Sequence, residues 1–460
     1  MTMQAMADTP HLLASYYGDD LTGSTDVMEA LELGGIPTVL FTTMPGEVLK
    51  NRFADRRAIG LAGTSRSQTP DWMEENLTPA FTWLKGLGAA VCHYKVCSTF
   101  DSSPTVGNIG RAVEIGRNVF RQKSVPMIVG APQLRRYTAF GNLFAGYRGE
   151  TFRIDRHPVM SRHPVTPMDE ADLLRHLARQ TALKSGLVDV AQLTSAARSA
   201  VVDQVRAEAE MFLFDVDSPQ TQKLAGSELW RIREPGGYFV AGSSGIEYAL
   251  LSAWAELGLA PGNARFEPVG AVDRIAVISG SVSPTTERQI RMAVTHGFEG
   301  IVLDPLALAI DNAGAAVAQA VDRGEAALAK GRSVVLYTAL GPAADQGPQI
   351  DRQPGARNRL SRNLGVILKN LAERQKLKRV VIAGGDTSSH ALSELGVEAL
   401  TIRVPLPQTP GSPLCIAHGT AAHVDGIEIA LKGGQIGADD YFCAMRSGQL
   451  NAGGGVVAKM

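Results

Sequence analysis

Two adjacent carboxylates lie where a short apolar run gives way to a predicted helix. In YYGDDLTGSTD, residues 16–26, the run HLLASYY stops at Gly18, and Asp19 and Asp20 follow it. Helix capping explains one acid, because an Asp side chain at an N-cap accepts hydrogen bonds from free backbone N–H groups. The other acid is available to accept the proton of a hydroxyl or to orient it. Which Asp faces inward is open, because adjacent side chains point in different directions.

Two further predicted strand ends carry polar and cationic side chains. GTSRS follows the strand at 58–63, and CSTFDSS follows the strand at 90–96. Because parallel strands of such sheets end at a common ligand-binding edge, these side chains should lie near the two acids. Arginine binds carboxylates bidentately, and hydroxyls and acids bind sugar hydroxyls. We therefore predict a site for a small polyhydroxylated anion, with caps and turns as the alternative; its candidates are Asp19, Asp20, Thr22, Gly23, Arg66 as a carboxylate clamp, Lys95, Ser98, Thr99 and Asp101.

The second half of the chain has comparable loops that are richer in glycine. SGSVSPTTERQI follows the predicted strand at 274–280, GGDTSSHAL follows the strand at 379–385, and LKGGQIGADDYF comes later. Ser283 is a predicted N-cap before Pro284, and a small-residue loop that enters a helix N-terminus also binds phosphate. The candidates for phosphate contacts are Ser281, Ser283, Gly384, Gly385, Asp386, Thr387, Lys432 and Gly434. Asp386 can also reach a metal ion, but no Cys/His spacing resembles a zinc site.

Apolar strand-like runs alternate with helix-length amphipathic segments, which predicts an α/β fold. We expect strands at 36–41, 58–63, 90–96, 125–131, 211–216, 237–242, 274–280, 300–304, 333–339 and 379–385. We expect helices at 22–33, 71–86, 106–122, 169–183, 194–208, 245–257, 284–296, 312–330 and 357–374. ALTIRVPLP…SPLCIAHG should add two strands of antiparallel style, and 132–166 should form an extended or hairpin excursion.

A segment without periodicity, 257–273, is the predicted linker because it contains Pro261, Gly262, Pro268 and Gly270 and shows no repeat of apolar residues. The predicted domains are 1–258 and 272–460. Each should be a largely parallel sheet flanked by helices, with a cleft between the two domains. Ligands of open α/β sheets bind beyond the carboxyl ends of the strands, which is where the candidate residues stand.

Composition excludes several classes of protein. The 460 residues are 45% hydrophobic and 20% charged with a net charge of −1, which gives no electrostatic case for nucleic acid or a membrane surface. No run of 18 apolar residues predicts a membrane span, and the first ten residues lack the regions of a signal peptide. Four scattered cysteines predict reduced thiols and a cytoplasmic location. Neither G-x-x-x-x-G-K-[ST] nor a strand followed by G-x-G-x-x-G is found, which argues against P-loop and dinucleotide sites.

Seven stretches in one order resemble the four-carbon acid sugar kinases: GDDLTGSTD, GTSRS, YKVCSTFDSS…GNIG, RHPVTPM, SGSVSPTTERQI, GGDTSS and LKGGQIGADDYF. The resemblance implies a sugar-acid-binding domain in 1–258 and a nucleotide-binding domain in 272–460. It implies phosphorylation of a hydroxyl on a small sugar acid, with ATP and its Mg²⁺ as cofactors. One of Asp19 and Asp20 would then accept the hydroxyl proton or orient the hydroxyl, and we favour Asp20 because it lies closer to the Thr22–Gly23 turn.

Departures from the family pattern bear on the substrate. Where threonate and erythronate kinases read like K-x-D-S-T-L-R-G-N, this chain has Cys97 at the Asp position and Asp101 at about the Arg position. HPVTPM is more similar to the 3-oxo-tetronate kinase branch, from which RRYTAFGNLFA departs in turn. We expect a 3-oxo-tetronate-like substrate, with a branched oxo-acid such as 3-oxo-isoapionate as the alternative.

Two other functions stay open at this level. A non-catalytic sugar-acid-binding protein would need only the loops of the first domain, and release of ADP from ATP would argue against it. An oxidoreductase lacks its dinucleotide fingerprint, whereas an aldolase could use Lys95 as a Schiff base, which borohydride would trap. The expected partners are a small-molecule sugar acid and ATP, without nucleic acid or membrane, and a homo-oligomer is open.

Overall fold

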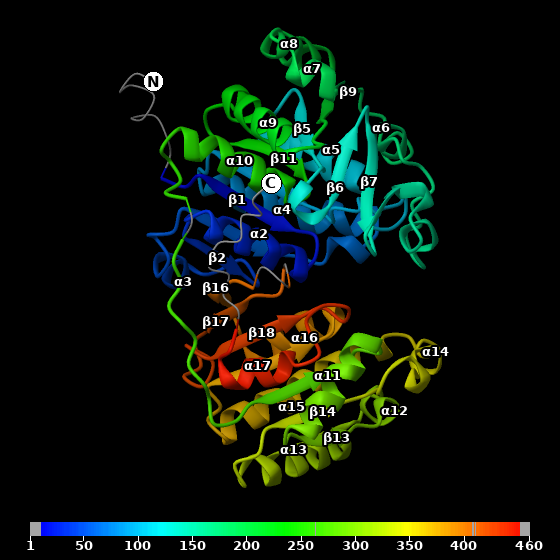
Figure 1. Ribbon diagram of the computed structural model, residues 1–460, viewed down its shortest axis with the longest axis vertical. Coiled ribbons are helices and arrows are strands. Elements are labelled where there is room, and N and C mark those ends of the chain that lie inside the picture. The colour runs from blue at the N-terminus through cyan, green and yellow to red at the C-terminus, as the bar shows by residue number, and fades with distance from the viewer. Residues whose placement is uncertain (1–10, 263, 407–408, 410, 451–460) are drawn as a thin grey trace. The chain divides into compact units, whose positions relative to one another are not determined.

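The computed structural model describes residues 11–262, 264–406, 409 and 411–450, and it does not describe the side chain of Asp386. The chain forms two compact units, of which the first ends at Ala264 and the second begins at Arg265 (Figure 1). This boundary lies inside the predicted linker, whose described residues form neither helix nor strand. The domain limits 1–258 and 272–460 themselves remain predictions. No described helix is long and apolar enough to cross a membrane.

The first unit is built on a parallel sheet whose described strands run in the order β2-β3-β1-β4-β11-β5-β10-β9. The strands are β1 (Ala14–Gly18), β2 (Thr38–Phe41), β3 (Ala58–Ala62), β4 (Val91–Lys95), β5 (Val125–Ile128), β9 (Ser185–Val188), β10 (Met211–Phe214) and β11 (Tyr238–Gly242). Most of these strands are buried along their whole length, as expected where helices cover both faces of a parallel sheet. Because β1 lies between β3 and β4, the three loops predicted to meet follow three neighbouring strands.

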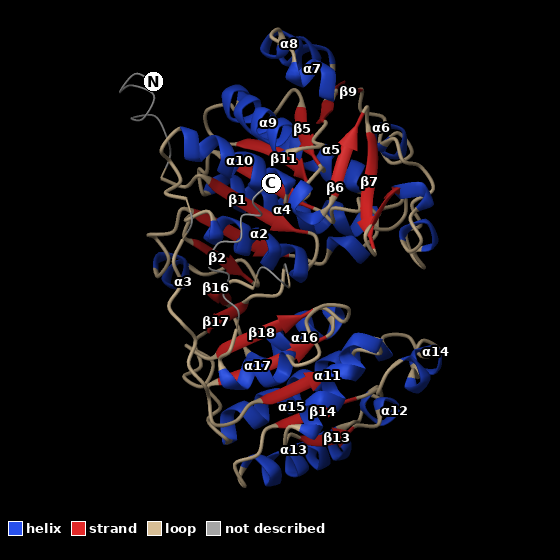
Figure 2. Ribbon diagram, viewed as in Figure 1, coloured by secondary structure: helices blue, strands red, loops and turns tan. Residues whose placement is uncertain are grey.

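Helices cover this sheet in two groups (Figure 2). One group contains α2 (Leu21–Leu33), α9 (Pro219–Ile232) and α10 (Gly245–Glu256), and the other contains α4 (Pro70–Gly86) and α5 (Ile109–Phe120). Right-handed crossovers account for the division, because α2 leads from β1 toward one edge of the sheet and α5 leads from β4 toward the other. The shorter helices are α3 (Glu47–Asn51), α6 (Leu173–Leu177), α7 (Val190–Thr194) and α8 (Arg198–Glu208).

The helix predicted at 169–183 is wrong in extent, since only α6 forms there. The chain leaves the helix because Gln180 is used elsewhere: its Oε1 accepts a hydrogen bond from the N–H of Ile109, at the start of α5, at 2.8 Å. The strand β9 and the helices α7 and α9 are additional to the predicted elements. Such a long-range contact leaves no local pattern in the sequence, so periodicity alone extends the helix too far.

A three-stranded antiparallel sheet occupies the segment predicted as a hairpin excursion, which confirms that prediction. Its strands are β6 (Arg136–Ala139), β7 (Asn142–Tyr147) and β8 (Glu150–Arg153). The excursion is fixed to the residues that follow β10, because Thr138 and Val216 exchange two hydrogen bonds of 2.8 Å. The buried carboxylate of Asp215 also accepts from the N–H of Gly141, and burial raises the pKa of Asp215 to about 7.

The second unit has a mainly parallel sheet in the order β13-β14-β12-β15-β18-β17-β16, in which β17 is antiparallel to both of its neighbours. Its strands are β12 (Ala276–Ser279), β13 (Glu299–Val302), β14 (Val334–Tyr337), β15 (Arg379–Ala383), β16 (Ala399–Val404), β17 (Leu414–His418) and β18 (Glu428–Lys432). The antiparallel pair β16–β17 was predicted, but β18 was not, so Lys432 ends a strand instead of merely preceding a loop.

The helices of the second unit also form two groups. α13 (Gly314–Leu328), α15 (Ala356–Arg374) and α16 (Gly385–Leu395) pack together, and α11 (Pro284–Thr295) packs with α17 (Tyr441–Ser447). Two short helices, α12 (Pro305–Leu308) and α14 (Gly347–Ile350), complete the unit. In both units the first strand lies between the third and the fourth, so crossovers leave it in opposite directions. Ligands of α/β sheets bind at such a switch point.

Candidate functional site

The backbone brings the three loops of the first unit together around Asp19. Its N–H donates to the carbonyl oxygen of Lys95 at 2.9 Å, and its own carbonyl oxygen accepts from the N–H of Arg66 at 3.1 Å. The loops after β1, β3 and β4 therefore touch through main-chain hydrogen bonds. The side chains that they carry share one edge of the sheet because these bonds hold the loops in register.

The two adjacent acids are held in two different ways. Asp20 is the N-cap of α2, and its Oδ1 accepts from the N–H of Gly23 at 2.6 Å. Asp19 receives both Nε and Nη2 of Arg66, at 3.0 and 2.7 Å. Nη1 of the same guanidinium donates to Oδ2 of Asp20 at 2.6 Å. Capping thus accounts for Asp20, and a bidentate pair with Arg66 accounts for Asp19.

Burial decides the electrostatics of this cluster. The side chain of Asp19 is 7% exposed and that of Asp20 is 30% exposed. Burial raises the pKa of Asp19, and Arg66 beside it opposes that rise. Burial also disfavours the charge of Arg66, but the carboxylates of Asp19 and Asp20 outweigh it and hold the pKa of Arg66 well above its usual value. The sequence predicted Arg66 as a clamp for a substrate carboxylate; in the structure its fork is engaged by Asp19.

Lys95 faces a third acid that the sequence analysis did not select. The buried Nζ of Lys95 lies 3.7 Å from Oδ2 of Asp26, whose pKa burial raises. A Cβ on Gly23 would lie 3.0 Å from this Nζ and 2.6 Å from Oδ1 of Asp20. A side chain at position 23 would therefore press on the lysine ammonium and on the capping carboxylate. The signal for Asp26 was its place in the same short stretch, one helical turn and a half beyond Asp20.

The loop after β4 turns sharply and binds the RHPVTPM segment. Phe100 is buried with a φ of 58°, a left-handed conformation that a bulky residue rarely adopts. This turn sets the hydroxyl of Thr99 2.5 Å from Oδ1 of Asp101 and 2.8 Å from Sγ of Cys97. Oδ2 of Asp101 accepts from the hydroxyl of Thr166 at 3.3 Å. Two motifs far apart in the sequence are thus joined through one carboxylate.

The remaining candidates of the first unit are less constrained. The side chains of Thr22 and Ser98 are partly exposed in their loops. Gly107, in the GNIG stretch, has a φ of 61°, and a Cβ there would lie 2.5 Å from the carbonyl oxygen of Arg66. The sequence did not explain that stretch, and the structure does: it allows a second chain segment to pass directly against the Arg66 loop.

In the second unit, hydroxyls and a lysine gather at the ends of β12 and β18. Oγ of Ser281 accepts from the N–H of Ser283 at 3.2 Å and lies 3.1 Å from the hydroxyl of Thr286. That hydroxyl lies 2.9 Å from the carbonyl oxygen of Gly434 and accepts from Nζ of Lys432 at 3.1 Å. Sequence analysis missed Thr286. It is the third residue of α11, a position at which a capping box has Glu or Gln, so a threonine there did not indicate a contact with another loop.

Glycines let the loops of the second unit cross closely. A Cβ on Gly280 would overlap Oγ1 of Thr387, and a Cβ on Gly434 would lie 2.8 Å from Oγ of Ser281. Gly384 has a φ of 121° and begins α16 without a side-chain cap, followed by the exposed Gly385. Backbone N–H groups at such a helix start are suited to a phosphate. The described residues contain no group of three or more His, Cys, Asp or Glu placed to hold a metal ion, and the Asp386 side chain lies outside the description.

Lys432 is buried, and no carboxylate among the described side chains pairs with its Nζ. The ammonium donates to the carbonyl oxygen of Gly433 at 2.8 Å and to the hydroxyl of Thr286. Burial lowers the pKa of Lys432 to about 8. A second residue missed by sequence analysis, Gln289, holds the following loop by donating from Nε2 to the carbonyl oxygens of Ile436, Gly437 and Ala438.

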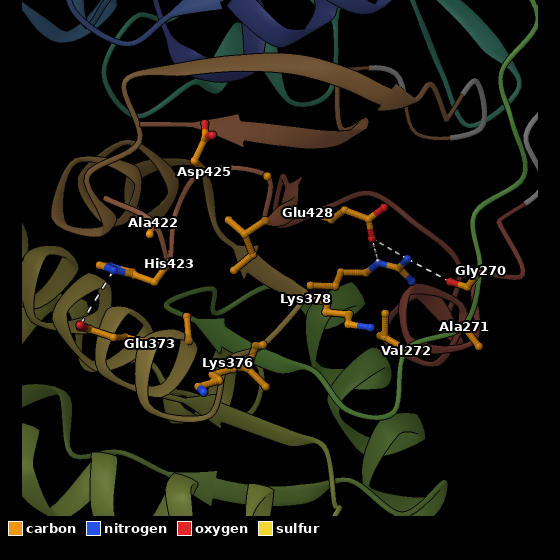
Figure 3. Close-up of a pocket in the computed structure, with 15 residues that line it drawn as sticks. Gly270, Ala271, Val272, Glu373, Lys376, Lys378, Ala422, His423, Asp425 and Glu428 are labelled. Atoms are coloured by element: carbon orange, nitrogen blue, oxygen red, sulfur yellow. Dashed lines mark hydrogen bonds and ion pairs between the residues drawn. The ribbon is translucent and has the colours of Figure 1, made fainter. Parts of the chain in front are cut away.

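A pocket of the second unit lies at the opposite end of the same strands (Figure 3). Arg379 and Glu428, which begin β15 and β18, line it and form an ion pair of 2.6 Å. Arg379 also donates to the carbonyl oxygen of Gly270 at 3.0 Å. These contacts tie the end of the linker to the sheet. Gly384 and Lys432, at the other ends of β15 and β18, are therefore remote from this pocket.

Comparisons with known proteins agree with the two units. A model described as "Sugar-binding N-terminal domain" matches residues 14–250, and one described as "Nucleotide-binding C-terminal domain" matches residues 276–442. The chain is 44% identical over 453 residues to the 3-oxo-isoapionate kinase of Paraburkholderia graminis, covering 95% of each protein. It is 30% identical over 444 residues to the 3-oxo-tetronate kinase of Methylobacterium radiotolerans, covering 92% of this chain and 96% of that protein. The solved structure of Haemophilus influenzae protein HI1011 matches with a TM-score of 0.71 and 25% identity, over 95% and 99% of the two chains.

We predict that Gly434→Ala weakens ADP binding by about tenfold or more, which is the effect of losing one well-placed contact. The new methyl group would press on Ser281 and displace the loop from the start of α11. Gly433→Ala is the matched control, because its Cβ would lie 3.4 Å from Cδ1 of Ile436, an ordinary contact. Calorimetric titration with ADP measures both variants; equal affinities would place the nucleotide away from this loop.

We predict that ADP affinity falls roughly tenfold between pH 7 and pH 9. Because burial has lowered the pKa of Lys432 to about 8, its ammonium loses the proton over this range, and a phosphate binds only the charged form. Lys432→Met should bind ADP weakly and with a flat pH profile. A similar pH slope in both proteins would show that another group titrates.

Proposed function

We propose that the acceptor of this kinase is a branched oxo-acid, 3-oxo-isoapionate. The premise is that the chain belongs to the four-carbon acid sugar kinase family and is an ATP-dependent sugar-acid kinase. The observation that supports this acceptor is the 44% identity over 95% of both chains to a 3-oxo-isoapionate kinase. A 3-oxo-tetronate, which the sequence analysis placed first, is the second candidate, supported by relatives at about 30% identity.

The two units have separate tasks in this proposal. Residues 1–258 bind the sugar acid among Thr22, Gly23, Arg66, Lys95, Ser98, Thr99 and Asp101. Residues 272–460 bind ATP, accompanied by Mg²⁺, among Ser281, Ser283, Gly384, Gly385, Asp386, Thr387, Lys432 and Gly434. Loops that approach closely at Gly280 and Gly434, together with the buried ammonium of Lys432, are suited to a polyphosphate. Backbone N–H groups and an ammonium both bind phosphate oxygens. A cytoplasmic location, the lack of nucleic-acid or membrane partners and a homo-oligomer remain predictions.

Bound ATP supplies the phosphoryl group, and the protein supplies position and charge, which is most of what phosphoryl transfer requires. Asp20 is the better placed acid to receive the acceptor's proton, since its side chain is 30% exposed whereas that of Asp19 is 7% exposed and holds Arg66 on both oxygens. Asp19 is then a positioning residue that holds the guanidinium against Asp20. Lys95 contributes a buried cation, paired with Asp26 at 3.7 Å, next to the acid pair.

The acceptor is tested by following ADP release with 3-oxo-isoapionate, 3-oxo-tetronate and threonate. We expect kcat/KM for the branched acid to exceed that for the unbranched acids by at least about tenfold, the scale of one added group in a fitted pocket. A preference for 3-oxo-tetronate would establish the second candidate. Failure to release ADP with any sugar acid would refute the proposed function altogether.

We predict that Asp20→Asn lowers kcat by about 10² to 10⁴ and lowers the melting temperature less than Asp19→Asn does. Asparagine keeps the cap on Gly23 but cannot take a proton, and it gives up the charge-assisted bond from Nη1 of Arg66. Asp19→Asn should behave differently, because it leaves the charge of Arg66 poorly paired and destabilises the protein. Turnover and melting temperature are measured for both variants. If both variants keep more than about a tenth of wild-type turnover, the loss is smaller than any general-base contribution in that range, and the acid pair is structural.

A further inference from the structure

Arg136, the first residue of β6, carries a guanidinium whose Nε has no acceptor among the described residues. Its side chain is half-buried, and Nη1 donates to the carbonyl oxygens of Leu134, Arg135 and Gly146 at 3.0, 3.2 and 3.5 Å. Nε is buried, and no described carboxylate forms an ion pair with this arginine. An arginine that is taken partly out of water without a carboxylate is expensive, so its Nε side is suited to an anion.

The backbone of Arg136 is fixed at the carboxyl edge of the first sheet. Its N–H and carbonyl oxygen exchange hydrogen bonds of 3.1 and 2.8 Å with Ala131, three residues beyond the end of β5. The exchange of bonds between Thr138 and Val216 fixes the same strand to the residues after β10. The guanidinium is therefore presented by a rigid hairpin at the edge where the candidate acceptor loops end.

Hydrogen bonds join the hairpin of this guanidinium to the loop after β4 through the end of β11. The N–H of Val96 donates to the carbonyl oxygen of Gly242 at 2.7 Å, and the hydroxyl of Ser243 donates to the carbonyl oxygen of Val129 at 2.7 Å. Val129 lies between β5 and the start of the hairpin, so the hairpin and the loop that carries Ser98, Thr99 and Asp101 leave the same edge of the sheet.

The thiol of Cys97 also acts electrostatically on both Arg66 and Arg136. The two arginines differ in their partners. Arg66 donates three hydrogen bonds to the carboxylates of Asp19 and Asp20, whereas no described carboxylate pairs with Arg136.

The two cations among the acceptor loops, Arg66 and Lys95, are already paired with acids. Arg66 and Lys95 face the three acids Asp19, Asp20 and Asp26 at 2.6 to 3.7 Å, which leaves no uncompensated positive charge for an anionic substrate. For Arg66 to hold a substrate carboxylate side-on it would have to release Asp19, whose carboxylate already occupies its Nε–Nη2 edge. Arg136 has that edge free of carboxylate.

We propose that Arg136 binds the carboxylate of the sugar-acid substrate through its Nε–Nη2 edge, so that the hairpin excursion selects acids over neutral sugars. The inference rests on the proposed function, because it assumes that a sugar acid is the acceptor. Arg66 then orders the catalytic acids, and its remaining donors are left for substrate hydroxyls.

The test compares Arg136→Gln with Arg135→Gln, using whichever sugar acid the wild-type protein phosphorylates and the primary amide of that acid. Arg135 is the matched control because it is the preceding arginine, is exposed and donates to the carbonyl oxygens of Gly149 and Glu150. We expect Arg136→Gln to raise KM for the acid by roughly tenfold or more, to leave KM for ATP unchanged and to abolish the preference for acid over amide. Arg135→Gln should keep that preference.

Three results would overturn the inference. The first is an unchanged preference for acid over amide in Arg136→Gln, and the second is an equal effect of Arg135→Gln. The third is a loss of kcat with both acceptors at unchanged KM, which would assign Arg136 to the transferred phosphoryl group. Arg136→Lys, which keeps the charge and loses the fork, should fall between wild type and Arg136→Gln; it replaces Arg136→Gln if melting shows that variant to be unfolded. Failure of the wild type to phosphorylate any sugar acid would instead refute the proposed function.

Discussion

The bidentate pair between Arg66 and Asp19 is the interaction on which the acceptor site depends. It joins the loops after β1 and β3, while the N–H of Asp19 joins β1 to the carbonyl oxygen of Lys95 at the end of β4. A buried ion pair contributes little net stability, yet removing one partner costs about 3–5 kcal/mol because a charge is left unpaired. The pair therefore acts mainly as a geometric constraint: it fixes the position of Asp20, which receives the third donor of the same guanidinium.

The two units share a strand order at the switch point of their sheets but carry different kinds of side chain there. In each, the first strand lies between the third and fourth, so a loop at the switch point is flanked by two others. The first unit fills that point with opposite charges, which suits hydroxyls that must be oriented and deprotonated. The second fills it with glycines, hydroxyls and Lys432, whose Nζ has no carboxylate among the described residues. Such a site leaves its positive charge for phosphate, because no internal acid competes for it.

Local pattern predicted the strands and their loops well because both depend on nearby residues. Alternation of apolar runs and helices gave the two sheets, and turn residues located GDD, GTSRS and GGDTSS at strand ends. Pattern could not assign partners, since Arg66 and Asp19 are 47 positions apart. The same limit explains why Arg66 was predicted as an open clamp and why Thr286 and Gln289, which act through residues about 150 positions away, were missed.

If Arg136 binds the acceptor as proposed, substrate preference and proton removal depend on different parts of the first unit. The acids, Arg66 and Lys95 come from loops that the sheet itself holds, so changing them would disturb β1, β3 and β4 together. Arg136 comes from an inserted sheet whose attachment depends on a few bonds to Ala131 and to the residues after β10. Under that proposal, a change in the hairpin would alter which acceptor is bound without moving Asp19, Asp20, Arg66 or Lys95. This separation is consistent with a segment, RRYTAFGNLFA, that departs from the pattern of the 3-oxo-tetronate kinases while GDDLTGSTD stays close to it.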